Sequence, residues 1–236
     1  MTTAGARGLV VGLTGGVDSA VVARLAQLAA PSAVIAAVLP CHSDPADEGD
    51  AAAVASHFSL TTVRIDLSPA CDQLTAGARS AMETLPATVR KSQTSPDRRP
   101  IANIESRLRM TALYCLADSL NYLVAGTSSR AAIAAGHFTK YGDSGVDLVP
   151  LGRLLKRDVR SLARDLGVPA QIIARAPSAG LWAGHTPEAE PGFSYDELDR
   201  YLDEGPESVA PATALKIERL IRSAEHKSQL PPMPDL

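Results

Sequence analysis

The chain has 236 residues, of which 45% are hydrophobic and 21% are charged, with 17 glycines and 17 prolines. A chain of this size and composition forms a hydrophobic core without staples, so disordered, collagen-like and low-complexity classes are excluded. The formal net charge of -3 lacks the basic excess typical of nucleic-acid-binding proteins, and we expect no nucleic-acid partner.

The cysteines and the N-terminal segment bear on the cellular compartment. Cys41, Cys71 and Cys115 are odd in number and lack metal-ligand spacing, so we expect reduced, buried thiols. The first apolar run, which begins near residue 8, is too short for a signal peptide or a membrane span. The sequence therefore predicts a cytoplasmic protein with no membrane partner.

The N-terminal third alternates apolar runs with helical patterns. Residues 8–13 are β-branched and apolar and predict a buried strand that ends in a glycine turn. The next helix should begin at Asp18 or Ser19, which suit its cap, and end before Pro31. Strands at 33–39 and 61–67 flank an alanine-rich helix. This alternation predicts βαβ units, and hence an α/β fold with a doubly wound parallel sheet.

The rest of the chain is expected to be mostly helical. Residues 86–101 are rich in proline, serine and arginine and predict a loop. A further strand is expected at 122–126, and residues 228–236 form a proline-rich tail. No repeat is visible, so we expect a single domain over 1–236. Helices are predicted at 103–120, 156–166, 195–202 and 206–223.

The sequence LTGGVDSA, between the first strand and the first helix, carries the clearest chemical signal. Backbone N–H groups and the positive helix end at such a turn create an anion site, although glycine-rich turns also occur as plain connections. The turn is neither a Walker A loop nor a GxGxxG fingerprint. The hydroxyls of Thr14 and Ser19 can join a phosphate cradle, and the carboxylate of Asp18 suits a hard cation such as Mg²⁺.

LTGGVDSA resembles the PP-loop of the ATP pyrophosphatases, which cleave ATP between its α and β phosphates. Later blocks resemble the ammonia-dependent NAD synthetases, in the family's order and over nearly the whole chain. These blocks are NIESRLRM, AGTSS, GHFTKYGDSGVDLVPLGRLLKRDVR, PSAGLWAGHT, SYDELDRYL and EHK. The resemblance implies a Rossmann-like PP-loop fold and a two-step ligase. A carboxylate attacks the α-phosphate of ATP, and ammonia then displaces AMP, which is a good leaving group.

The resemblance also implies roles for individual residues. ATP binding falls to Thr14, Gly15, Gly16, Asp18, Ser19, Arg109, Thr127, Lys156 and Ser178, with Asp18 as the metal ligand. Catalysis falls to Asp143, near the attacking ammonia, and to Lys156 and Ser178. Substrate binding falls to Asn103, Arg107, His137, Lys140, Asp147, His226 and Lys227. The implied cofactors are ATP and Mg²⁺, and the implied partners are a small carboxylate such as deamido-NAD, ammonia and a second copy in a homodimer.

One departure from the family pattern concerns the metal. Ala132 stands where the family has a glutamate that serves as a second metal ligand, and alanine cannot bind a cation. Either Asp18, phosphates and water hold Mg²⁺, or metal use is altered. Three functions therefore stay open: an NAD synthetase, a relative that adenylates a different carboxylate, and a nucleotide-binding homologue without turnover. Taken singly, Lys140 and Asp143 also fit a solvated loop pair.

Overall fold

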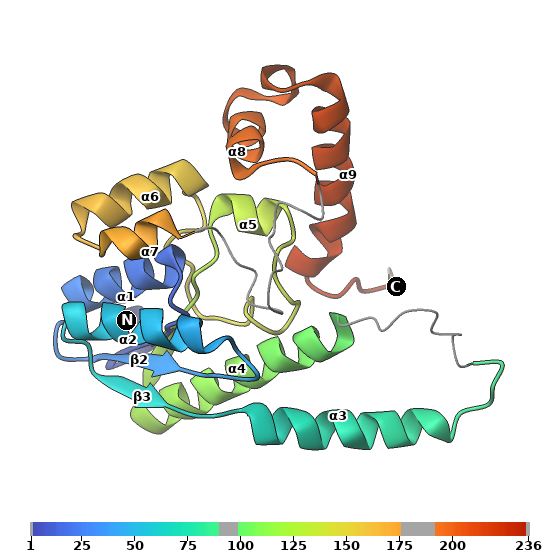
Figure 1. Ribbon diagram of the computed structural model, residues 1–236, viewed down its shortest axis with the longest axis horizontal. Helices are drawn as coiled ribbons and strands as arrows, with labels where there is room; N and C mark the ends of the chain where they lie inside the picture. The colour runs from blue at the N-terminus through green and yellow to red at the C-terminus, as the bar shows by residue number, and fades with distance from the viewer. Residues whose placement is uncertain (1, 90–98, 176–191, 235–236) are drawn as a thin grey trace.

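The computed structural model describes residues 2–89, 99–175 and 192–234, and its centre is a parallel four-stranded sheet with the order β3-β2-β1-β4 (Figure 1). Strand β1 (Gly8–Gly12) pairs with β2 (Val34–Val38) on one side and with β4 (Tyr122–Ala125) on the other. Strand β3 (Thr62–Arg64) pairs with β2. The chain thus moves outward from β1 and then returns to its other side, which places a topological switch point between β1 and β4.

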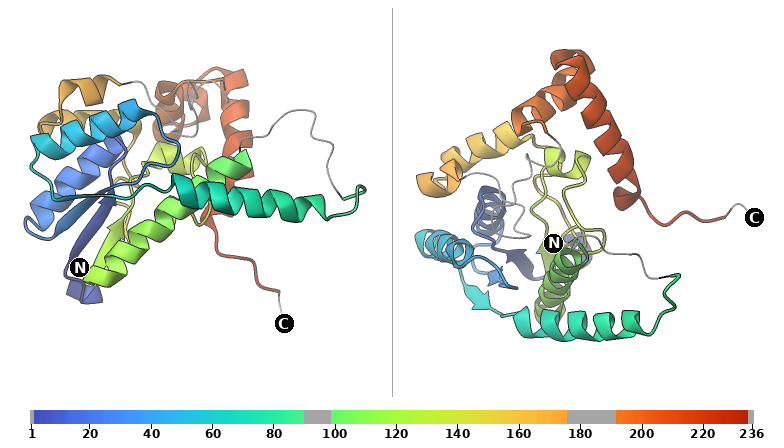
Figure 2. Two further views of the ribbon diagram at one scale, coloured as in Figure 1. Left: turned by 60° about the horizontal axis from the view of Figure 1, so that its bottom comes forward. Right: turned by 45° about the vertical axis from the view of Figure 1, so that its right-hand side comes forward.

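Helices cover both faces of this sheet (Figures 1 and 2). Successive side chains of a strand point to opposite faces, so Leu9 and Val11 pack into one core and Val10 packs into the other. The first core includes residues of α1 (Val17–Ala29), α2 (Pro45–His57), α6 (Lys156–Asp165) and α7 (Ala170–Ala174). The second includes residues of α3 (Ser68–Glu83) and α4 (Arg99–Leu120). The predicted α/β fold with a doubly wound parallel sheet is confirmed.

The C-terminal helices form a third cluster beside the sheet (Figure 1). It joins α5 (Arg130–Ala134), α8 (Tyr195–Glu204) and α9 (Pro211–Ser228) around buried Leu198 and Ile217. Short 3-10 turns lie at Thr2–Ala4 and Pro206–Ser208. This cluster places α8 against the start of α6, where the functional site lies.

Several predicted boundaries differ from the structure. Helix α1 begins at Val17 with Gly16 as its N-cap, so the prediction of a cap at Asp18 or Ser19 is wrong. The Ser19 hydroxyl instead donates to the Gly16 carbonyl at 2.9 Å. Strand β3 covers only three residues of the predicted 61–67, because the chain turns toward α3 soon after the pairing with β2 ends.

The predicted loop and the last helix also need correction. Helix α4 already begins at Arg99, so the end of the predicted loop 86–101 is helical, whereas 90–98 lie outside the described residues. Helix α9 begins at Pro211 instead of residue 206. A proline at the first helical position loses no hydrogen bond and has the right φ for a helix start, which favours that boundary.

The cysteines only partly follow expectation. Cys41 and Cys71 are buried, whereas Cys115 is exposed on α4, so the prediction of burial is wrong for Cys115. Burial, followed by the neighbouring Cys71, raises the pKa of the Cys41 thiol to about 12. This thiol is therefore neutral and packs as a small apolar group. Across the described part of the chain, no helix is long and apolar enough to cross a membrane.

Candidate active site

The turn between β1 and α1 gathers hydroxyl and backbone groups at the carboxyl end of the sheet. The Thr14 N–H donates to Ser19 Oγ at 3.2 Å, and the two hydroxyl oxygens lie 3.1 Å apart. The Gly16 N–H donates to Thr14 Oγ1 at 3.3 Å. These contacts hold the hydroxyls next to the positive end of α1, which is the arrangement of an anion site.

Gly15 is the point at which α2 packs on this turn. Its φ of +82° lies in the left-handed region, which glycine adopts without strain. A Cβ at Gly15 would lie 2.6 Å from the Asp47 carbonyl oxygen and 2.9 Å from Asp50 Cβ. Both the backbone conformation and the close approach of α2 therefore require glycine here.

Asp18 and Lys156 form an ion pair at the turn. Lys156 Nζ donates to Asp18 Oδ2 at 2.6 Å, although the two residues lie 138 positions apart. Lys156 is only 6% exposed, and its Nζ lies 5.6 Å from the centre of the Tyr195 ring. The other carboxylate oxygen, Asp18 Oδ1, is buried and has no hydrogen-bond partner among the described residues. Such oxygens are rare in folded proteins, and a hard cation would satisfy this one.

Asp199 on α8 fixes the start of α6 and therefore the position of Lys156. Its side chain is only 1% exposed. Its Oδ1 accepts from the Lys156 N–H at 3.1 Å and its Oδ2 accepts from the Arg157 N–H at 2.9 Å. The first N–H groups of a helix have no acceptor inside the helix, so Asp199 supplies one from another element. Sequence analysis missed this role, because a capping residue 43 positions away has no local signature.

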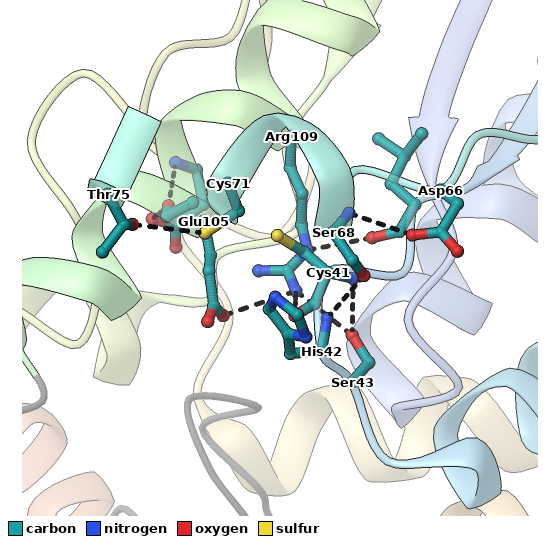
Figure 3. Close-up of polar contacts among 12 residues, drawn as sticks. Cys41, His42, Ser43, Asp66, Ser68, Cys71, Thr75, Glu105 and Arg109 are labelled. Atoms are coloured by element: carbon teal, nitrogen blue, oxygen red, sulfur yellow. Dashed lines mark hydrogen bonds and ion pairs between the residues drawn. The ribbon is translucent and has the colours of Figure 1, made fainter. Parts of the chain in front are cut away.

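Arg109 on α4 orders the segment that follows β2 (Figure 3). Its Nε donates to the Leu39 carbonyl at 3.1 Å, and its second terminal nitrogen donates to Ser43 Oγ at 3.2 Å and to the Cys41 carbonyl at 3.4 Å. Glu105, one turn earlier, lies 3.8 Å from the same guanidinium. Burial raises the pKa of the Glu105 carboxyl, and the nearby Arg109 charge opposes that shift.

A second polar cluster surrounds Asp143. Its Oδ1 accepts from Ser106 Oγ and from the Thr139 N–H, both at 2.8 Å. Thr139 Oγ1 in turn donates to Asn103 Oδ1 at 2.8 Å. Helix α4, which carries Asn103 and Ser106, thereby fixes both the Asp143 carboxylate and the loop after α5 that contains Thr139 and Asp143.

Two lysines tie the end of α9 to the same loop. Lys227 Nζ donates to the carbonyls of Gly136 at 2.8 Å and Phe138 at 3.2 Å. In the other direction, Lys140 Nζ donates to the His226 carbonyl at 2.6 Å. These reciprocal contacts close the C-terminal helix over the loop, with His226 contributing its backbone to them.

One cavity of about 710 Å³ joins the turn between β1 and α1 (residues 13–16, named the phosphate turn after the role expected from the sequence) to the Asp143 cluster. It lies at the carboxyl ends of β1, β2 and β4, where open α/β sheets place ligands. Ala132 and Arg175 also line it. Ser178 lies outside the described residues. The predicted residues that line the cavity are Thr14, Gly16, Asp18, Ser19, Asn103, Arg109, Thr127, His137, Asp143, Lys156 and Lys227.

The remaining predicted residues are not part of this lining: Gly15 lies under α2, and Lys140 and His226 belong to the lysine contacts. Asp147 Oδ2 accepts from the Val124 N–H at 2.7 Å, at the edge of β4, and Asp147 Oδ1 accepts from the Tyr114 hydroxyl at 3.2 Å. Burial, followed by the Asp147 charge, raises the pKa of Tyr114 to about 12. Arg107 donates to the Lys140 carbonyl at 3.2 Å.

Comparison with known proteins places this site in a family. The sequence model of the family described as NAD synthase matches residues 1–231. The NH(3)-dependent NAD(+) synthetases of Carboxydothermus hydrogenoformans and Syntrophomonas wolfei are both 44% identical, over 99% and 98% of this chain and 91% and 88% of their own lengths. The structure described as NMN synthetase from Francisella tularensis has a TM-score of 0.88 at 33% identity, over 100% of this chain and 92% of its own. The chain therefore belongs to the NAD synthase family.

Proposed function

We propose that this chain is an AMP-forming carbon–nitrogen ligase that converts deamido-NAD, ammonia and ATP to NAD, AMP and pyrophosphate. The observation that carries the proposal is the Asp18–Lys156 pair at the phosphate turn, in one cavity with the Asp143 cluster. The NH(3)-dependent NAD(+) synthetases that match nearly the whole chain support it.

The proposed residues act mainly through positioning and charge. A carboxylate oxygen attacks the α-phosphorus of ATP and pyrophosphate leaves; ammonia then attacks the acyl carbon, and AMP leaves with the bonding electrons. Lys156 and the N–H groups of the phosphate turn stabilise the charge on the phosphates. Asp143, which is fixed through one oxygen by Ser106 and Thr139, accepts the proton that the attacking nitrogen loses.

Mg²⁺ fits this site as a companion of ATP. The orphaned Asp18 Oδ1 offers a buried anionic oxygen, and phosphate oxygens with water complete the shell that this ion prefers. Ala132 lines the cavity but offers no ligand atom. No cluster of three or more His, Cys, Asp or Glu side chains that could hold a metal occurs in the described ranges. When bound, Mg²⁺ would neutralise phosphate charge next to Asp18.

A second candidate substrate is the mononucleotide acid that corresponds to NMN. It is favoured by the likeness to the Francisella tularensis structure, which covers the whole chain with a TM-score of 0.88 and is described as an NMN synthetase. Both substrates carry the same reacting carboxylate. The same adenylation chemistry would therefore serve either one.

One reaction tests the proposal. Purified protein is mixed with ATP, Mg²⁺ and ammonium, and with either deamido-NAD or the mononucleotide acid, and the products are measured by chromatography and mass spectrometry. We expect NAD and AMP in equal amounts from deamido-NAD. If an amide forms from the mononucleotide acid but not from deamido-NAD, the mononucleotide acid is the substrate and deamido-NAD is not. ATP binding without release of AMP in either mixture would refute the ligase.

We also propose that the chain is one cytoplasmic domain that forms a homodimer. Helix α3 supports the dimer, because Cys71 is its only buried residue and it extends beyond the body of the molecule (Figure 1). Large apolar side chains on and just after this helix are exposed, and a second copy would cover them.

A further inference from the structure

Arg175 joins the end of α7 to the first turns of α2. One terminal nitrogen of its guanidinium donates to the Asp50 carboxylate and the other donates to the Asp47 carboxylate. The three side chains are between 22% and 28% exposed, so water screens these ion pairs less than it screens surface pairs. Asp47 and Arg175 line the cavity described above.

The residues that carry these two carboxylates pack against the phosphate turn. A Cβ built at Gly15 would lie 2.6 Å from the Asp47 carbonyl oxygen and 2.9 Å from Asp50 Cβ. Glu48, in the same turn of α2, also lines the cavity, as does Asp18. Fixed negative charges beside an anion site repel a polyphosphate and weaken its binding. A guanidinium that neutralises two of these charges removes much of the repulsion.

We propose that Arg175 is a positioning residue of the ATP site: it neutralises Asp47 and Asp50 so that a triphosphate can bind beside Gly15. The inference rests on the proposed function for the identity of the nucleotide. Arg175 acts through the two carboxylates and not by contact with the phosphates. Both terminal nitrogens are engaged, and withdrawal of the guanidinium would leave two partly buried carboxylates uncompensated.

The test compares ATP dissociation constants, measured by calorimetry with Mg²⁺ present, for the wild type and three variants. Arg175→Gln leaves both carboxylates uncompensated, and we expect ATP to bind at least about tenfold more weakly. The double variant Asp47→Asn, Asp50→Asn removes the repulsion itself and should bind ATP as tightly as the wild type or more tightly. Combining all three substitutions should restore the dissociation constant to within about threefold of the wild type.

Restoration in the triple variant separates neutralisation from direct contact. If Arg175 touched the phosphates, removal of the carboxylates would not restore binding, and that result would overturn the proposal, as would unchanged binding by Arg175→Gln. Should Arg175→Gln fail to fold, the Asp47→Asn, Asp50→Asn variant still decides, because weaker ATP binding in it contradicts neutralisation.

A matched control comes from Arg64 on β3. It pairs with Glu48 at 2.8 Å, in the same turn of α2, but is itself exposed and does not line the cavity. Arg64→Gln uncovers one carboxylate instead of two and removes an ion pair that water already screens, so it should weaken ATP binding clearly less than Arg175→Gln does. Equal weakening by the two variants would overturn the proposal. All these titrations omit the carboxylate substrate and ammonia. A wild type that binds ATP but forms no NAD would therefore refute the proposed function without changing the outcome for Arg175.

Discussion

Asp199 is the residue whose effect on the reaction can be tested most directly. Asp199→Asn keeps the shape of the side chain but replaces one of its two acceptor oxygens by a donor that faces a backbone N–H. The start of α6 should shift and carry Lys156 away from Asp18. We expect kcat to fall about 10–100-fold, with a much smaller change in KM for ATP, since small misplacements of reacting groups cost rates of this order.

A control on the same pair of helices excludes a general loss of structure. Asp203, also on α8, pairs with the side chain of Arg157, and both side chains are over 40% exposed. An exposed pair of this kind contributes about 0–1 kcal/mol to stability. Asp203→Asn should therefore retain the wild-type kcat. If both variants lose activity in proportion to their unfolding temperatures, Asp199 is only structural.

Glu105 makes stability depend on pH in a predictable direction. Burial raises its pKa above the ordinary value of 4.5, although the charges of Arg109 and His42 oppose this. The folded state thus holds the proton more firmly than the unfolded state. The stability that this provides is complete below the ordinary pKa and is lost as pH rises through the raised value. Glu105→Gln has no such loss.

Urea unfolding of the wild type and of Glu105→Gln, from pH 4 upward, measures this difference. We expect the wild-type free energy of unfolding to fall relative to the variant as pH rises through that window, and to level off above it. Parallel pH profiles would show that Glu105 ionises equally easily in both states, and would contradict the effect of burial.

At the scale of elements, the contact between α2 and the phosphate turn makes opposite predictions for two glycines. Gly15→Ala forces a side chain into a left-handed backbone and against the Asp47 carbonyl oxygen at 2.6 Å. The strained conformation alone costs about 1–3 kcal/mol, and α2 must also move. We expect unfolding stability to drop by at least about 2 kcal/mol and ATP binding to be lost.

Gly49, inside α2, is the matched control. An added Cβ there meets no atom within 4 Å, and the position is helical. Gly49→Ala should stabilise the protein by about 0.5–1 kcal/mol, because alanine loses less entropy in a helix. Thermal and urea unfolding measure both variants. Equal effects of the two substitutions would mean that the approach of α2 to Gly15 does not matter.

The elements themselves divide into those that local pattern predicts and those that it does not. Strands β1, β2 and β4 and helices α4, α6 and α8 were predicted because apolar periodicity is a local property. Helices α5 and α7 escaped prediction, since five residues are too few to show a period. Helix α3 was not among the predicted helices either, and only Cys71 of its 16 residues is buried.

The same division applies to the site. The phosphate turn could be found from sequence, because the turn after the first strand of an α/β sheet is a common phosphate site and its hydroxyls are sequence neighbours. Asp199 and Arg175 could not, because their partners lie more than 40 and 120 residues away. The resemblance to the family also could not show that Asp143 and Asp147 have different positions. Asp143 lines the cavity, whereas Asp147 accepts a hydrogen bond at the edge of β4.

At the scale of the whole molecule, the exposed side of α3 predicts association. Leu74 and Met82, about two turns apart on α3, are 51% and 54% exposed, and Leu85 and Val89 beyond the end of the helix are 37% and 63% exposed. Monomeric proteins rarely expose an apolar row of several large side chains, and such a row marks a contact surface. We expect sedimentation equilibrium to show a dimer. The double variant Leu74→Glu, Met82→Glu should be a monomer with unchanged helix content, because a charge buried in an apolar interface is costly.

A control distinguishes association through α3 from non-specific association through other exposed apolar side chains. Leu230 and Met233, in the segment after α9, are even more exposed, at 87% and 85%, but do not lie on a helix face. Leu230→Glu with Met233→Glu should therefore remain dimeric. A monomeric wild type would refute the dimer outright. A dimer that persists in the α3 variant would show that the interface lies elsewhere, and the exposed row on α3 would then need another partner.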